Sequence, residues 1–245
     1  MKREKNIRLI IEYNGTRFSG WQYQPGLLTV QGEIESALKK LTSQKVAVIG
    51  AGRTDAGVHA LGQTANFMIT HDLPVVKYRD GLNFYLPAQI RIKQAEEVAP
   101  DFHARYDAIW RQYRYRIGFG RSALFGSRRW EIERGLDKML LDKAATIILG
   151  EHNFATFCAV SSQKGSNRCL VYESRWEWQG SELSYEIIAD RFLHNMIRSL
   201  VGLMVDVGTG GVTTRSFREL FRSHDHTALR QVAPPQGLYL VAVGY

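Results

Sequence analysis

The chain has 245 residues, of which 44% are hydrophobic, and this composition excludes an intrinsically disordered protein. Its length fits one large domain or two domains of roughly 100–150 residues each. The formal net charge of +8 favours a polyanionic partner such as nucleic acid, although a basic enzyme without such a partner carries a similar charge.

The first half of the chain predicts strands that alternate with helices. Residues 7–13 are β-branched and begin with an alternating pattern, which indicates a strand, and Asn14-Gly15 then supplies a turn. Residues 29–41 place apolar side chains at spacings of three and four, as an amphipathic helix does. The other elements predicted here are a short strand at 46–49, a loop at 50–57, a strand at 63–69, a helix at 75–86 and a strand at 90–98.

The second half repeats this mixture of elements. Strands are predicted at 110–117, 171–179, 184–189 and 238–243, and helices at 141–149, 192–207 and 216–223. Strands joined by both hairpins and helices predict an α+β fold with two similar halves and mixed, mainly antiparallel sheets. We place the boundary so that the N-terminal domain covers residues 1–103 and the C-terminal domain covers residues 104–245.

The cysteines and the N-terminus bear on the compartment. Cys158 and Cys169 match no zinc-binding spacing, so we expect free, buried or half-buried thiols. The N-terminus is charged and lacks the apolar stretch of a signal peptide, and no run of 18 apolar residues occurs. We therefore expect a cytoplasmic protein with no membrane partner.

The loop between the second and third predicted strands contains the motif GRTDAGVH, at residues 52–59. Small residues on both sides of Asp55 would let a large ligand approach the backbone. The simplest interpretation of Asp55 is a turn in which its carboxylate binds nearby backbone amides. However, Arg53 and His59 make a mixed-charge cluster with it, and such clusters on glycine-rich connections are typical of functional loops.

Histidines raise the question of a metal site. The spacings of His59, His103 and His194 fit no metal-binding signature, so structural hydrogen bonding is the better interpretation of each. We therefore expect no metal site.

The motif at 52–59 resembles, residue for residue, the active-site motif of the tRNA pseudouridine synthase A family. Further segments resemble that family in the same order along the chain: residues 12–15 with 18–22, Gln31 with Glu33, 101–106, 113–115, 150–154, 192–198 and 237–240. The stretches 121–130 and 161–168 resemble it least. The resemblance implies the pseudouridine synthase fold, in which the two halves meet at a basic active-site cleft.

The resemblance also implies roles for individual residues. Asp55 would be the catalytic aspartate, and Arg53 would help to flip the uridine and fill the gap that it leaves. Tyr113 would stack on the flipped base, Arg198 would pair with the catalytic carboxylate, and Leu238 would line the pocket.

Two further substrate contacts are predicted, at Arg105 and His59. The choice of Tyr113 as the stacking residue leaves Tyr115 as an alternative, because residues two apart face the same side of a strand.

The implied reaction converts uridine to pseudouridine at positions 38, 39 and 40 of the tRNA anticodon stem-loop, and the resemblance implies a homodimer. The reaction breaks the N1–C1′ bond, turns the uracil and joins C5 to C1′, so it needs no cofactor. The base must first leave the stack, which costs a few kcal/mol. The carboxylate could trap C1′, attack the base or remove the 2′-proton, and the sequence leaves all three open.

Two other functions are consistent with a basic chain of this kind. A glycosidic hydrolase acting on a nucleoside would normally use two paired acidic residues, and the Asp55 loop holds only one. A non-catalytic RNA-binding module would be free to lose Asp55, Arg53 or Arg198, and all three are present. We therefore predict an RNA pseudouridine synthase.

Overall fold

The computed structural model describes residues 3–158, 166–223 and 231–245. Most of the stretch 161–168, which resembles the family least, lies outside the described residues. The chain divides into two compact units, one made of Met1–Ile109 with Tyr239–Tyr245 and the other of Trp110–Leu238. The sequence prediction placed residues 104–109 and the C-terminal strand in the second domain, whereas the structure groups them with the first unit.

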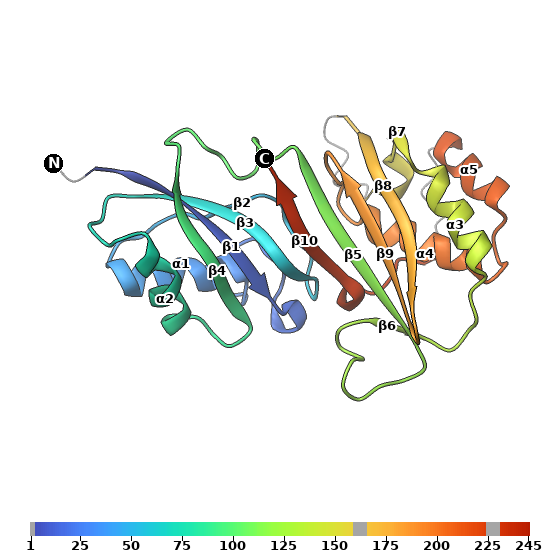
Figure 1. Cartoon of the computed structure of the whole chain (residues 1–245), viewed down its shortest axis with the longest axis horizontal. Coiled ribbons are helices and arrows are strands. Elements are labelled where there is room, and N and C mark those ends of the chain that lie inside the picture. The colour runs from blue at the N-terminus through green and yellow to red at the C-terminus, as the bar shows by residue number, and fades with distance from the viewer. Residues whose placement is uncertain (1–2, 159–165, 224–230) are drawn as a thin grey trace. The chain divides into compact units, whose positions relative to one another are not determined.

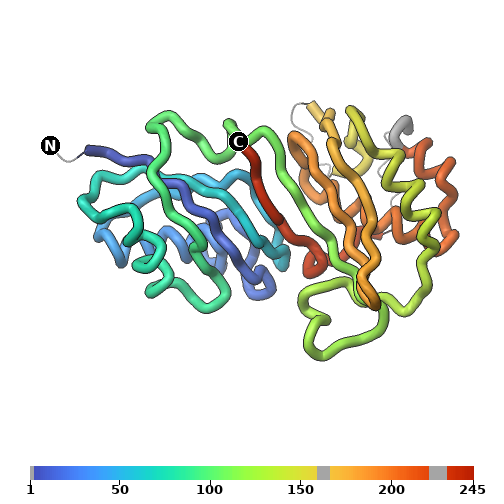
Figure 2. The backbone as a smooth tube through the Cα atoms, in the orientation of Figure 1, coloured from blue at the N-terminus to red at the C-terminus, as the bar shows by residue number. Residues whose placement is uncertain are grey.

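The first unit is built on an antiparallel sheet. Strand β1 (Lys5–Tyr13) lies between β3 (His59–Ile69) and β4 (Ile90–Val98), and it is antiparallel to both. The short strand β2 (Ile49–Gly50) is antiparallel to β3. Strand β10 (Leu238–Gly244) runs parallel to β3 at its N-terminal end, so the chain returns to this sheet after the second unit is complete (Figure 2).

Two helices, α1 (Val30–Thr42) and α2 (Val76–Tyr85), contact each other and cover one face of this sheet (Figure 1). Helix α1 begins after Thr29, whose side chain accepts a hydrogen bond from the Gly32 N–H, and such a cap satisfies one of the free donors of the first turn. The ring of Phe67 on β3 packs edge-on against Tyr78 of α2, with centroids 5.7 Å apart. These apolar contacts form the core of the unit.

The second unit contains a further series of mainly antiparallel strands. Its order is β5 (Trp110–Phe119), β9 (Glu182–Ala189), β8 (Arg168–Gln179) and β7 (Gly150–Asn153), and β6 (Trp130–Ile132) lies parallel to β5. The strands predicted at 171–179 and 184–189 are confirmed as β8 and β9, which form an antiparallel hairpin. Strands β6 and β7 were not predicted, because three and four residues are too few to show an alternating pattern.

Three helices complete this unit: α3 (Lys138–Ile147), α4 (Met196–Gly208) and α5 (Thr214–Ser223). They contact one another, and α3 also contacts β8 (Figure 1). Helix α4 begins at Met196 rather than at 192, because Asn195 has a φ of 64° and cannot belong to a right-handed helix. The mixture of sheets and helices confirms the predicted α+β class.

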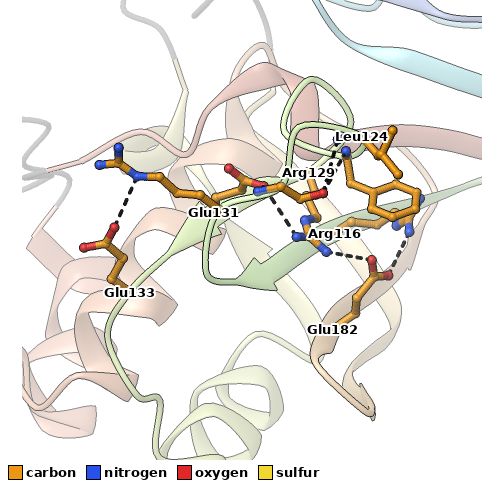
Figure 3. Close-up of polar contacts among 9 residues, drawn as sticks. Arg116, Leu124, Arg129, Glu131, Glu133 and Glu182 are labelled. Atoms are coloured by element: carbon orange, nitrogen blue, oxygen red, sulfur yellow. Dashed lines mark hydrogen bonds and ion pairs between the residues drawn. The ribbon is translucent and has the colours of Figure 1, made fainter.

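A ladder of charged side chains joins β5, β6 and β9 (Figure 3). The Arg129 guanidinium is buried, and it donates to Glu182 at 3.0 Å and to Glu131 at 3.4 Å. Arg116 donates to the other oxygen of Glu182 at 2.7 Å. The Arg116 hydrogen bond is the largest cause that lowers the pKa of Glu182. This ladder fixes both ends of the connection between β5 and β6.

Among the residues that the structure describes, no helix has the length and apolar character needed to cross a bilayer.

Candidate active site

The motif at residues 52–59 forms a braced turn in the first unit. The Val58 N–H donates to the Asp55 carbonyl at 3.2 Å, which closes a four-residue turn. Gly57 has a φ of 80° at the third position of this turn, whereas Ala56 has a negative φ. This combination defines a type II turn, which requires glycine or asparagine at that position. Asp55 is half-buried at the start of the turn, and Arg53 is exposed just before it.

The backbone of this turn is held by the segment that follows β1. The Trp21 N–H donates to the Thr54 carbonyl at 3.0 Å. The hydroxyl groups of Tyr13 and Thr54 lie 2.7 Å apart in a hydrogen bond, and both side chains are buried. Gly20 has a φ of 92°, and a Cβ atom there would lie 2.7 Å from the Thr54 carbonyl oxygen. The peptide between Thr54 and Asp55 therefore lies directly against a glycine.

His59, expected to contact the substrate, lies in the interior of the first unit. Only 2% of its surface is exposed. Its Nδ1 accepts a hydrogen bond from the Gly15 N–H at 3.1 Å, and its ring stacks on Tyr239 of β10 with centroids 4.7 Å apart and planes inclined by 21°. An imidazole that accepts at Nδ1 carries its proton at Nε2 if it is neutral.

Arg105 lies in the same unit, in the segment 99–107 after β4. The Ala104 N–H donates to Asn66 Oδ1 at 2.9 Å, and the hydroxyl of Tyr245 donates to the Ala104 carbonyl at 2.7 Å. Asn66 is seven residues beyond His59 along β3, which at 3.3 Å per residue corresponds to roughly 23 Å. Arg105 itself is exposed, and its guanidinium lies 5.7 Å from the centre of the Tyr106 ring.

Arg198 belongs to the second unit and lies in the first turn of α4. Its Nε donates to the Ala233 carbonyl at 2.8 Å, and its Nη1 donates to Asn195 Oδ1 at 3.1 Å. The Ala233 N–H donates in return to the Arg198 carbonyl at 3.0 Å. Asn195 therefore has two structural roles. Its left-handed backbone precedes the first residue of α4, and its side chain orients the Arg198 guanidinium.

The two candidate tyrosines of β5 have different surroundings. Tyr113 is 7% exposed and meets Phe192 edge-on, with ring centroids 5.1 Å apart. Tyr115 is fully buried, and its hydroxyl donates to the Pro234 carbonyl at 2.7 Å. Burial raises the pKa of Tyr115 well above its ordinary range, and the nearby Arg198 charge opposes this shift. The Tyr115 hydroxyl is thus already bonded within the core of the unit, and its buried ring offers no exposed face for a base.

Leu238 follows the short 3₁₀ helix Pro235–Gly237 and is 6% exposed. Gly237 lies against the Tyr115 ring, where a Cβ atom would come within 2.6 Å of Cζ. The segment that carries Leu238 is therefore fixed at Tyr115 by a hydrogen bond and by close packing.

The sequence predicts that the histidines form no metal site and that both cysteines are free thiols. Among the residues described, no three His, Cys, Asp or Glu side chains come together in a way that could hold a metal ion. Cys158 and Cys169 are buried free thiols, as predicted. Burial is the main cause that raises the pKa of Cys169 to about 12.

Sequence reasoning missed the residues that support the turn. Tyr13 and Thr54 are 41 positions apart, and nothing in the sequence pairs them. Asn195 was noted only as one residue of the segment 192–198, without a role of its own. The sequence separates residues in such contacts too widely for periodicity or spacing to reveal them.

Comparison with known proteins gives the family. Residues 9–107 and 144–245 match the profile of a family described as tRNA pseudouridine synthase. The chain is similar to the tRNA pseudouridine synthase A of Acetivibrio thermocellus, with 40% identity over 243 residues that cover 98% of this chain and 100% of that protein. It belongs to the tRNA pseudouridine synthase family. The protein of the same description from Lysinibacillus sphaericus is also 40% identical, over 245 residues that cover 98% of this chain and 100% of that protein.

Family membership confirms the resemblance that the sequence motifs indicated. Pseudouridine synthases are isomerases, so the predicted class of enzyme is confirmed as well. The matched range 9–107 includes the Asp55 turn and the segment that supports it, and the range 144–245 includes Arg198 and Leu238. Tyr113 lies between the two ranges.

Proposed function

We propose that this protein isomerises uridine to pseudouridine in tRNA and that Asp55 is the essential carboxylate. The observation that carries the proposal is the Asp55 turn, in a chain that belongs to the pseudouridine synthase family. A half-buried carboxylate on a rigid turn can be brought to a nucleotide without losing its orientation, and correct placement of a reacting group supplies a large part of an enzymic rate enhancement.

The other site residues complete the proposal. Arg53, exposed beside the turn, would fill the space left by the flipped uridine. Arg198 would keep the catalytic carboxylate ionised, and its hydrogen bonds to the Ala233 carbonyl and to Asn195 support this role because they fix its guanidinium. Tyr113 would stack on the base and Leu238 would make apolar contact with it.

Arg105 and His59 differ in how well the structure supports a substrate contact. Arg105 is exposed, and its attachment near Asn66 would suit a phosphate several nucleotides away from the reacting uridine. His59 is buried, so its surroundings favour a role behind the reacting groups.

The sequence resemblance extends the proposal to the target and the assembly. We propose that the uridines are those at positions 38, 39 and 40 of the anticodon stem-loop, and that the enzyme works without a cofactor as a cytoplasmic homodimer. The formal charge of +8 supports an RNA partner. The mass of the protein in solution would test the dimer.

The proposal is tested with purified protein and unmodified tRNA. Pseudouridine is mapped at single-nucleotide resolution with the wild type, Asp55→Ala and the isosteric Asp55→Asn. We expect product at positions 38–40 with the wild type and a loss of more than 1,000-fold in turnover with both variants, while tRNA still binds. Asp55→Asn is the sharper variant, because it keeps the size of the side chain and removes only the charge.

Arg198→Met in the same assay separates catalysis from binding. We expect turnover to fall much more than tRNA affinity, because the guanidinium acts on the carboxylate. An equal fall in both would instead assign Arg198 to phosphate contact. Product from Asp55→Ala would contradict the central role of Asp55, whereas tight tRNA binding without product from the wild type would favour an RNA-binding module.

A further inference from the structure

The Asp55 turn and the His59 ring that follows it contact residues from two distant parts of the chain. The end of β1 and the segment after it contact the turn through the Tyr13 hydroxyl and the backbone of Gly15 and Gly20. Tyr239 of the C-terminal strand stacks on the His59 ring. All of these groups belong to the first unit.

His59 contacts both of these parts of the chain. Its Nδ1 accepts from the Gly15 N–H at 3.1 Å, and its ring lies 4.7 Å from that of Tyr239. It is also the first residue of β3, paired with Tyr239 in the parallel ladder, and it directly follows Val58, which closes the turn. A displacement of the imidazole would therefore be transmitted to the turn through a single residue.

Close packing makes this connection stiff. A Cβ atom on Gly15 would overlap the Val58 carbonyl, so the two backbones are in direct contact. The Tyr13–Thr54 hydrogen bond, at 2.7 Å and fully buried, fixes the residue before Asp55 in the same way. Packed interiors transmit small displacements rather than absorb them.

We propose that His59 is a positioning residue for Asp55, with Tyr239 as its support, and that it does not contact the substrate. The Gly15 hydrogen bond fixes the C-terminal end of the turn, and the Tyr239 ring holds the imidazole in the plane that this bond requires. This inference rests on the proposed function, because it assigns a role in the reaction of Asp55. Tyr239, on the C-terminal strand β10, would thus contribute to catalysis without lying next to the reacting atoms.

Two substitutions of His59 separate its two contacts. His59→Asn places an oxygen close to the position of Nδ1, so it retains an acceptor for the Gly15 N–H and loses the ring. His59→Phe retains a ring for Tyr239 and loses the acceptor. Single-turnover rates, tRNA dissociation constants and thermal unfolding are measured for both and for the wild type, with unmodified tRNA as substrate.

We expect His59→Phe to lower the single-turnover rate about 10- to 100-fold, since misplacement of a reacting group by about 1 Å costs about that much. The dissociation constant should stay within about threefold of the wild type. His59→Asn should recover only part of the rate, because it keeps the acceptor for the Gly15 N–H but loses the Tyr239 stacking that orients it, and it should unfold at a lower temperature. A residue that only stabilises the fold would instead lower the unfolding temperature and leave the rate at 25 °C unchanged.

Tyr13→Phe provides a second variant, which removes one hydroxyl and keeps the ring that fills the same space in the core. It should lower the rate several-fold at unchanged tRNA affinity, because it releases Thr54 on the other side of Asp55. Equal rates for His59→Phe and His59→Asn, or a weakened tRNA affinity at an unchanged rate, would overturn the inference while the wild type remains active. No product from the wild type would overturn the proposed function and this inference with it.

Discussion

Tyr113 and Tyr115 are two residues apart on β5, and the structure predicts that they have separate tasks. Tyr115→Phe removes one hydroxyl, which donates to the Pro234 carbonyl at 2.7 Å inside the second unit. The loss of a buried hydrogen bond costs about 1–2 kcal/mol when its partner is left without a donor. For a protein of this size, that cost corresponds to a fall of about 2–8 °C in the unfolding temperature.

Tyr113→Leu should act on the reaction instead. If the Tyr113 ring stacks on the flipped uracil, its loss removes roughly 1–3 kcal/mol of base stacking, which lowers kcat/KM roughly 5- to 150-fold. Tyr113→Phe is the matched control, because it keeps the aromatic face and should retain kcat/KM within a few-fold. Tyr115→Phe should retain kcat/KM at 25 °C within about twofold.

The assay measures pseudouridine formation on unmodified tRNA together with thermal unfolding of the four proteins. The reasoning is refuted if Tyr115→Phe loses activity at an unchanged unfolding temperature, since the hydroxyl would then serve the substrate rather than Pro234. It is also refuted if Tyr113→Leu keeps full activity.

Two further predictions concern titratable groups. The Arg116 hydrogen bond lowers the folded-state pKa of Glu182, so this carboxylate stabilises the fold above its ordinary pKa of about 4.5 and loses that contribution as the pH falls through the lowered value. Glu182→Gln should therefore unfold at lower urea concentration than the wild type at pH 7 and show a shallower loss of stability below pH 4.5, whereas Glu133→Gln, in an exposed ion pair with Arg121, should match the wild type. Burial raises the pKa of Cys169 to about 12, so iodoacetamide should label it rapidly in urea and negligibly in the folded protein at pH 8; rapid labelling of the folded protein would contradict its burial.

The elements that were predicted well are those whose own side chains determine them. Helix α1 has an apolar stripe and a threonine cap, and the observed Val30–Thr42 lies within one residue of the predicted 29–41. Strand β1 has the same advantage, with four buried hydrophobic residues at alternate positions. In both cases the pattern that predicts the element is also the face that it buries.

The elements that were missed depend on partners elsewhere in the chain. Strand β6 has only three residues and forms because it pairs with β5 and because Arg129 beside it is held by Glu182. The predicted strand at 46–49 contributes only Ile49 to β2, whose partners lie on β3. The predicted closing strand was placed correctly in the sequence, but its parallel pairing with β3 comes from long-range packing that no local pattern contains.

The site shows the same division between local and distant information. The motif at 52–59 was sufficient to single out Asp55, since its residue types and their order carry the resemblance to the family. The spacing of His59 favoured a structural hydrogen bond, but its burial and its partners were not predictable, because a histidine next to a charged loop has the same sequence context whether it faces solvent or the core. Its burial follows from Gly15 and Tyr239, which are 44 and 180 positions away.

The glycines around Asp55 sharpen this distinction. The sequence suggested that small residues on both sides of Asp55 let a ligand approach the loop. The structure adds a second demand from outside the motif, because Gly15 and Gly20 let another segment of the chain contact the backbone of the turn. An alanine at Gly20 would meet the Thr54 carbonyl at 2.7 Å and would also need a φ of 92°, which L residues rarely adopt. Small residues that a ligand would need on the exposed side of the turn are therefore matched by small residues on its buried side, where they keep the Asp55 carboxylate in place.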